Sequence, residues 1–259
     1  MDSWNPQQYE RFRSERARPL HDLADLVQPR PGLRVLDLGC GTGEGTRQLH
    51  DRWQAAETVG LDSSAAMLEK AAPLAGNGLR FAPGDIERLE EALGPSRWDV
   101  VFSNAALHWV PDHRALFPRL VSLLAEGGQL AVQMPANHGH PSHTTAYELA
   151  DEPPFHSALN GWRREVPVLS PEAYASLLHD LALTEQRVRL EVYGHELSSR
   201  ADVVEWVKGT LLTDYQSRLP PQLYEEFLAR YRERLLPRLS DARPFFYTFP
   251  RVLLWGRRR

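Results

Sequence analysis

The chain has 259 residues, of which 42 % are hydrophobic and 25 % are charged. These are ordinary values for a globular protein that buries a full core without metals or disulfides. The formal net charge of −4 is too small to attract nucleic acid or anionic membranes to the protein as a whole. The single cysteine, Cys40, excludes an intramolecular disulfide and a cysteine-rich zinc site.

The N-terminal residues contain no apolar signal core, and no stretch approaches the ~20 apolar residues that span a membrane. We therefore expect a cytoplasmic protein without a membrane or nucleic-acid partner, and we expect it to be a monomer.

Short apolar runs and helical patterns alternate through the first half of the chain. The runs predict buried parallel strands, and they cover residues 34–39, 57–62, 79–85, 98–106 and 127–135. Helical patterns lie between them, for example over residues 64–72 and 113–128. A succession of this kind predicts a mostly parallel, doubly wound α/β sheet.

The second half is less regular. Residues 136–168 are rich in His, Pro and Asn and show weak periodicity, whereas residues 199–240 read as a helical block. Residues 170–182 predict a helix with Ser170 as its N-cap. Residues 186–197 alternate like a strand, and a last strand leads into the basic tail.

These patterns predict a single domain with a seven-stranded, Rossmann-like sheet. Its core comprises about residues 19–135, 169–198 and 245–259. The remaining segments, about 1–18, 136–168 and 199–244, are expected to form a helical cap, because ligands bind beyond the carboxyl ends of the strands in open α/β sheets.

The strongest local signal is the sequence VLDLGCGTG over residues 35–43. A dinucleotide-binding loop, G-x-G-x-x-G, would need glycine at position 44. The chain has Glu44 there, an anion facing the place of a pyrophosphate. A phosphate-binding P-loop is excluded because no Gly-Lys-Ser/Thr follows.

The pattern D-x-G-x-G-x-G instead resembles the S-adenosylmethionine (SAM) loop of class I methyltransferases. Asp37, Gly39, Gly41 and Gly43 occupy its defining positions, and Cys40 lies between them as a small residue of a tight turn. SAM carries a sulfonium, an amino group and no phosphate, so an acid in the loop is compatible with it. The resemblance implies SAM as cofactor, S-adenosylhomocysteine (SAH) as product, and no metal.

Acids end the next two apolar runs. Asp62 is placed to accept hydrogen bonds from ribose hydroxyls, with Ser63 and Met67 beside it. The resemblance implies that Asp85 binds the adenine amino group and that the Ile86 backbone N–H meets the ring.

The run at residues 98–106 leads into SNAALHWVPD. In the family, this strand end lines the methyl-transfer cleft. The resemblance therefore places Asn104 and Ala105 at the methionine part of SAM, and His108 and Trp109 towards the acceptor.

Longer segments narrow the resemblance to the trans-aconitate 2-methyltransferase family. They are WNPQQYERFRSERARP near the N-terminus, LDLGCGTGEGTRQL, FSNAALHWVPDH, the segment ending in QMPAN, and the final FPRVLLWGRRR. The resemblance implies methyl esterification of a carboxylate of trans-aconitate, a small tricarboxylic acid. A carboxylate is already ionised at neutral pH, so we nominate no catalytic acid or base and expect catalysis by positioning.

A trianionic substrate needs cations, and guanidinium groups pair well with carboxylates. We expect at least two to reach the acceptor among Arg13, Arg16, Arg18, Arg163, Arg164, His108 and His156. Of these, Arg16, Arg18, Arg163 and His108 are the preferred substrate ligands, together with Trp109 and Tyr193. Tyr9 is expected to close over SAM.

Two alternatives stay open. One is a methyltransferase for another small carboxylic acid or for a malonyl thioester on a carrier protein, which arginines within 230–243 and 257–259 would dock. The other is a non-catalytic SAM-binding module. Nucleic-acid methylation is disfavoured by the net charge and by SNAALHW, which lacks the Asn/Asp-Pro-Pro-aromatic motif.

Overall fold

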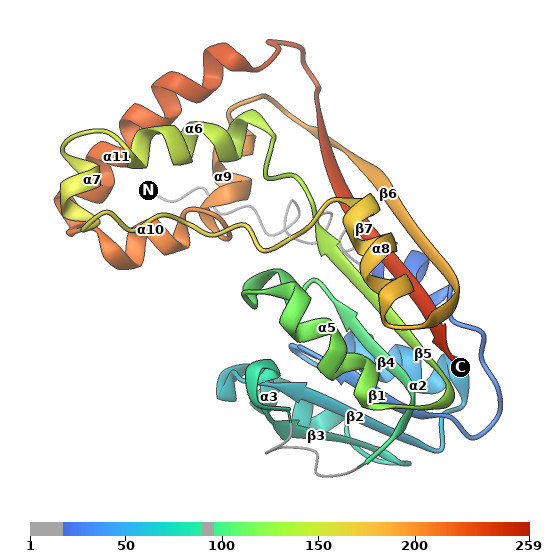
Figure 1. The fold of residues 1–259 in the computed structure, drawn as a ribbon. Coiled ribbons are helices and arrows are strands. Elements are labelled where there is room, and N and C mark those ends of the chain that lie inside the picture. The colour runs from blue at the N-terminus through green and yellow to red at the C-terminus, as the bar shows by residue number, and fades with distance from the viewer. Residues whose placement is uncertain (1–17, 90–95) are drawn as a thin grey trace. The chain divides into compact units, whose positions relative to one another are not determined.

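The structure, a computed structural model, describes residues 18–89 and 96–259 (Figure 1). The chain forms two compact units. Unit 1 comprises the described residues up to Met134 together with Pro167–Glu191 and Val252–Arg259. Unit 2 comprises Pro135–Val166 and Val192–Arg251.

The strands are β1 (Arg34–Leu38), β2 (Glu57–Asp62), β3 (Leu79–Pro83), β4 (Trp98–Asn104), β5 (Leu124–Pro135), β6 (Leu183–Leu197) and β7 (Phe245–Arg258). The helices are α2 (Glu44–Trp53), α3 (Ala65–Ala71), α5 (His113–Ser122), α6 (Pro141–Ala150), α7 (Phe155–Ala158), α8 (Pro171–Asp180), α9 (Asp202–Lys208), α10 (Thr213–Arg218) and α11 (Pro221–Leu235). Short 3-10 turns include Ile86–Arg88 and Leu107–Trp109.

The strands form one seven-stranded sheet in the order β3-β2-β1-β4-β5-β7-β6. Neighbours from β3 to β5 pair in parallel, whereas β7 runs opposite to β5 (Figure 1). From β1 the chain proceeds outward to β2 and β3, then returns to β4 on the other side. The strand order therefore reverses between β1 and β4. This is a topological switch point, and ligands bind beyond the carboxyl ends of the strands there. The predicted mostly parallel, doubly wound sheet is confirmed.

The central strands are buried because both faces of a parallel sheet are covered. Val35 and Leu36 of β1 and Val100 of β4 have no exposed surface. Val35 and Val100 belong to one buried hydrophobic cluster with Leu49 and Trp53 of α2. The Trp53 ring lies 5.8 Å from that of Phe102. These apolar runs read as strands because burial on both faces requires nearly continuous hydrophobicity.

The predicted helix over 113–128 is too long. Helix α5 begins where Asp112 caps the Ala115 N–H and ends at Ser122, and β5 begins at Leu124. The cause is strand pairing, since Leu124 is buried opposite Trp98 of β4. The other long helix prediction is confirmed in α8, where the Ser170 hydroxyl accepts the Ala173 N–H.

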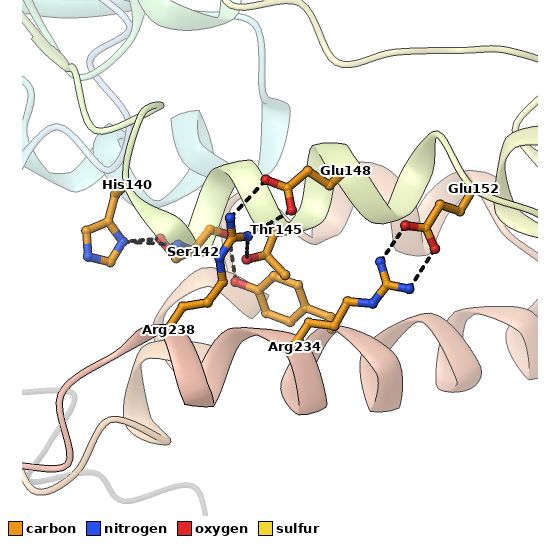
Figure 2. A network of polar contacts seen from close by, with 8 residues as sticks. His140, Ser142, Thr145, Glu148, Glu152, Arg234 and Arg238 are labelled. Carbon is orange, nitrogen blue, oxygen red and sulfur yellow. Dashed lines mark hydrogen bonds and ion pairs between the residues drawn. The ribbon is translucent and has the colours of Figure 1, made fainter.

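Residues 136–168 were predicted as part of a helical cap without individual helices, and unit 2 has α6 and α7 in this segment. The buried residues of α6 include the polar Ser142 and Thr145, which blurs its apolar pattern. Two bidentate ion pairs join this part of unit 2 (Figure 2): Arg234 of α11 binds Glu152 in the turn after α6, and Arg238, in the 3-10 turn Leu236–Arg238 that follows α11, binds Glu148 of α6. The helical block at 199–240 is confirmed as α9, α10 and α11.

Candidate cofactor-binding site

A pocket of about 590 Å³ opens in unit 1 where β1, β2, β3 and β4 end. Its walls come from the loops that follow these four strands. The lining residues are Gly39, Gly41, Asp62, Ser63, Ser64, Met67, Gly84, Asp85, Ile86, Glu87, Ala105, Ala106, Trp109 and Val110. Eight residues proposed from the sequence to bind the cofactor thus meet in one place: Gly39, Gly41, Asp62, Ser63, Met67, Asp85, Ile86 and Ala105.

The structure explains why glycine occupies each of the three loop positions. All three have left-handed backbone, with φ of 76° at Gly39, 55° at Gly41 and 75° at Gly43. A Cβ at Gly39 would lie 2.2 Å from that of Ala106, and one at Gly43 would lie 2.6 Å from the Phe81 ring. A Cβ at Gly41 would meet nothing within 4 Å. Two glycines therefore allow close packing, and the third faces the open pocket.

The acids at the strand ends hold the pocket walls. Asp62 Oδ2 accepts the Gly41 N–H at 2.9 Å, and Oδ1 accepts the Ser64 N–H at 2.8 Å. Asp85 Oδ1 accepts the Glu87 N–H at 2.9 Å and so caps the turn that begins at Ile86. Each carboxylate oxygen keeps a lone pair for a ligand donor.

The charge of the lining tests whether SAM fits. Asp62, Asp85 and Glu87 line the pocket, and no Lys or Arg is among the described lining residues. Such a lining repels a pyrophosphate and attracts a cation. Asn104, at the end of β4 and next to the lining residue Ala105, has a buried side-chain oxygen for which the described residues supply no hydrogen-bond donor, a role that an amino group fills. The residues present fit SAM.

Four of the predicted cofactor ligands are not among the described lining residues of the pocket: Asp37, Cys40, Gly43 and Asn104. Asp37 is buried and accepts the Thr46 hydroxyl at 2.6 Å. Burial raises the pKa of Asp37 to about 6, the Thr46 hydrogen bond opposes that rise, and the Asp62 charge adds to it. Burial and the same two acids raise the pKa of Cys40 to about 12, so it stays a thiol.

The residues predicted to face the acceptor are scattered. Trp109 lines the pocket and is 53 % exposed, and the His108 ring lies 4.8 Å from the Trp109 ring. The largely exposed Arg18 lies 3.8 Å from Asp22. Tyr9 and Arg16 lie outside the described residues.

Two further predicted ligands belong to unit 2. Arg163 is exposed and binds Asp151 through Nε at 2.8 Å. Tyr193 is buried, with the Arg251 guanidinium 5.9 Å from its ring.

Sequence reasoning missed some lining residues: Ser64, Gly84, Glu87, Ala106 and Val110. Ser64 had a detectable signal, because it precedes a helical pattern and its hydroxyl caps the Met67 N–H. Val110 had none, since only the 3-10 turn at Leu107–Trp109 brings it to the pocket.

Within residues 18–89 and 96–259, no group of three or more His, Cys, Asp or Glu side chains is arranged to hold a metal ion. No helix in the same part of the chain is long and apolar enough to cross a membrane.

Comparisons with known proteins also point to a methyltransferase. Residues 35–128 match a family model described as a methyltransferase domain. YcgJ from Bacillus subtilis has a similar fold, with a TM-score of 0.63 and 17 % identity over 93 % of this chain and 98 % of that one. Phosphoethanolamine N-methyltransferase 2 from Haemonchus contortus, solved with SAM, has a TM-score of 0.53 and 17 % sequence identity to this chain. The match covers 93 % of this chain and 52 % of that one. At these identities the likeness shows the class I methyltransferase fold.

Sequence relatives are similar over nearly their whole length. A trans-aconitate 2-methyltransferase from Deinococcus radiodurans is 44 % identical, covering 97 % of this chain and 96 % of its own. A relative of the same name from Rhizobium etli is 40 % identical over 97 % of this chain and 98 % of its own. Another, from Escherichia coli, is 37 % identical over 100 % of this chain and 99 % of its own. The chain therefore belongs to the trans-aconitate 2-methyltransferase family of SAM-dependent methyltransferases.

Proposed function

We propose that this protein transfers a methyl group from SAM to a carboxylate of trans-aconitate, giving the monomethyl ester and SAH. The observation that carries the proposal is the 44 % identity over nearly full length with a relative named for that reaction. The acid-lined pocket at the switch point of the sheet supports it independently, because its charge suits a sulfonium cofactor.

The proposed cofactor contacts follow the pocket lining. Asp62 binds the ribose hydroxyls, and Asp85 with the Ile86 N–H binds the adenine. Gly39, Gly41 and Ala105 let the backbone approach the ligand. The Asn104 side-chain oxygen accepts a hydrogen bond from the amino group of SAM. Ser63 and Met67 complete the wall, while Asp37, Cys40 and Gly43 shape the loop from behind. Tyr9 is proposed as a cover.

Catalysis in this proposal rests on positioning. When bound, SAM supplies a methyl group on a sulfonium sulfur, an electrophile that an ionised carboxylate attacks without a general base. The chain's residues orient the two reactants and exclude water from them. The proposed acceptor contacts are His108 and Trp109, with Arg16, Arg18, Arg163 and Tyr193 as further ligands. No side chain is assigned a proton-transfer role.

The proposal describes a cytoplasmic monomer that requires no metal, membrane or nucleic acid. Its test is incubation with methyl-labelled SAM and trans-aconitate. The expected result is equimolar SAH and a base-labile labelled ester. Binding of SAM without SAH formation, for trans-aconitate and other small acids alike, would instead indicate a non-catalytic binding module.

A further inference from the structure

The segment after β4 supplies four lining residues of the pocket, Ala105, Ala106, Trp109 and Val110. Its two parts are anchored to different elements of unit 1. At the start, the Ala105 N–H donates to the carbonyl of Gln133 in β5 at 2.9 Å. Further along, the carbonyl of the 3-10 turn Leu107–Trp109 meets an imidazole of α5 instead. The position of Trp109 therefore depends on what holds that imidazole.

The imidazole belongs to His113, the first residue of α5, which is buried. Its Nε2 lies 2.9 Å from the Leu107 carbonyl oxygen. Its Nδ1 is hydrogen-bonded to the hydroxyl of Tyr174, a buried residue of α8. The same hydroxyl accepts the Leu169 N–H at 3.2 Å. All of these residues lie in unit 1.

The two backbone groups fix the direction of every hydrogen bond between them. A carbonyl only accepts, so His113 Nε2 carries the proton. The Leu169 N–H only donates, so the Tyr174 hydroxyl accepts it and directs its own proton to His113 Nδ1. The Met134 sulfur, 4.0 Å from this hydroxyl, is a weaker acceptor. Burial lowers the pKa of His113, which keeps the imidazole neutral at neutral pH.

Aromatic packing holds the two side chains in place. The Phe117 ring lies 5.8 Å from that of His113 and 5.4 Å from that of Tyr174, and all three are buried. The Leu107 carbonyl also accepts the Val110 N–H at 2.9 Å, so both of its lone pairs are used. The imidazole and the turn thus meet at one atom, and a buried network whose members are all satisfied favours a single arrangement.

We propose that His113, oriented by Tyr174, is a positioning residue that holds the Leu107–Trp109 turn so that Trp109 faces the methyl acceptor. The inference rests on the proposed function, in which Trp109 contacts the acceptor. Neither His113 nor Tyr174 is among the described lining residues, so both act through the turn. Because Ala105 is anchored to β5, loss of the imidazole contact should disturb the acceptor side more than the cofactor.

A matched control is available in His50 of α2, another buried histidine of unit 1. Its Nδ1 lies 2.8 Å from the Thr58 hydroxyl and its Nε2 lies 3.0 Å from the Asn77 carbonyl oxygen. Thr58 is near the start of β2 and Asn77 precedes β3, whereas the pocket opens where these strands end. His50 therefore joins the same kinds of group away from the pocket.

The kinetic test compares Tyr174→Phe, which keeps the ring and removes the hydroxyl, with Thr58→Val, which removes the hydroxyl beside His50. Tyr174→Phe should lower kcat for trans-aconitate by about 10-fold while SAM affinity changes less than about two-fold. Thr58→Val should keep the wild-type kcat. His113→Gln, whose amide donates to the Leu107 carbonyl, should retain more activity than His113→Leu. Wild-type kcat in Tyr174→Phe and His113→Leu would overturn the proposal, as would an equal loss in Thr58→Val.

Amide hydrogen exchange separates this inference from the proposed function, because it needs no turnover. Tyr174→Phe should speed exchange of the Trp109 and Val110 amides by about 10-fold, and Thr58→Val should not. That result without turnover by the wild type would refute the methylation and support the positioning. Turnover with unchanged exchange and kcat in Tyr174→Phe would refute the positioning alone. A ¹⁵N spectrum of the wild type showing His113 protonated at Nδ1 would also overturn it.

Discussion

The Asp62 carboxylate connects the first two strand ends of the pocket. Its two oxygens fix the Gly41 amide in the glycine loop and the Ser64 amide at the start of α3. The sequence predicted a ligand contact for Asp62 but not this second task. Loss of the side chain is therefore expected to loosen the pocket walls as well as remove a ribose contact.

Asp62→Ala should weaken SAM binding by about 1–3 kcal/mol through lost charged hydrogen bonds. Calorimetric titration with SAM checks the value. Glu69→Ala, which removes an exposed acid of the neighbouring α3, is the matched control and should bind SAM as the wild type does. Unchanged affinity in Asp62→Ala would contradict the ribose assignment.

Asp37 predicts a pH dependence of stability. Its native pKa of about 6 lies above the ordinary 3.8, so between these values the native state holds more protons than the unfolded state. The free energy of unfolding should therefore fall as pH rises through this window, by about 3 kcal/mol at most.

Asp37→Asn removes this ionisation and keeps an acceptor for the Thr46 hydroxyl. Urea unfolding at pH 5 and 7.5 should show the variant gaining stability relative to the wild type at the higher pH. Glu69→Gln should keep the wild-type difference. A variant that loses stability relative to the wild type as pH rises would mean that burial does not disfavour the Asp37 charge.

At the scale of elements, two glycines in the turn between β1 and α2 are predicted to differ: Gly43 matters mainly for stability and Gly41 mainly for SAM binding. Gly43→Ala forces a Cβ against Phe81 and Ala71, in addition to a left-handed backbone. It should destabilise the fold by about 2–4 kcal/mol. Gly41→Ala carries only the backbone strain, about 1–2 kcal/mol, while its Cβ enters open space at the pocket.

Thermal unfolding and SAM titration of both glycine variants check the separation. Gly41→Ala should lose SAM affinity with a small change in Tm, and Gly43→Ala should lose mainly Tm. The reverse ranking would contradict the packing described for this loop.

Elements with a single local cause were predictable from the sequence. The run at residues 57–62 coincides with β2, whose four central residues are buried between polar ends. Ser170 marked the start of α8 for a local reason, its hydroxyl cap. The bounds of α6 within the predicted cap could not be given from the sequence, because Arg238, far along the chain, forms the hydrogen bonds to Thr145 and Glu148. The end of α5 was misplaced because pairing of Trp98 with Leu124 decided it.

At the scale of the whole molecule, strand order explains which part of the site was predictable. Eight of the cofactor residues proposed from the ends of β1 to β4 meet in one pocket, because parallel neighbours end at one edge of the sheet. No comparable rule predicts the positions of the arginines proposed to bind the substrate. Of two adjacent arginines, Arg163 is exposed and Arg164 is enclosed, a difference that depends on contacts with Asp151 and Asp214 from other elements.

Strands β5, β6 and β7 each run from one compact unit into the other, so we expect the two units to unfold together. SAH at about 100 times its Kd should raise the free energy of unfolding by about 2.7 kcal/mol and the single Tm by about 5–10 °C. Scanning calorimetry checks this. Two transitions, only one of them shifted by SAH, would show that the units unfold independently.

The most direct test of the central claim is the kcat/KM for methyl transfer measured side by side on trans-aconitate, cis-aconitate, citrate, isocitrate and a malonyl thioester on a carrier protein. We predict that trans-aconitate has the highest value and yields a monomethyl ester. A higher value for another acid or for the carrier thioester would leave the SAM pocket standing and contradict the assignment of the acceptor.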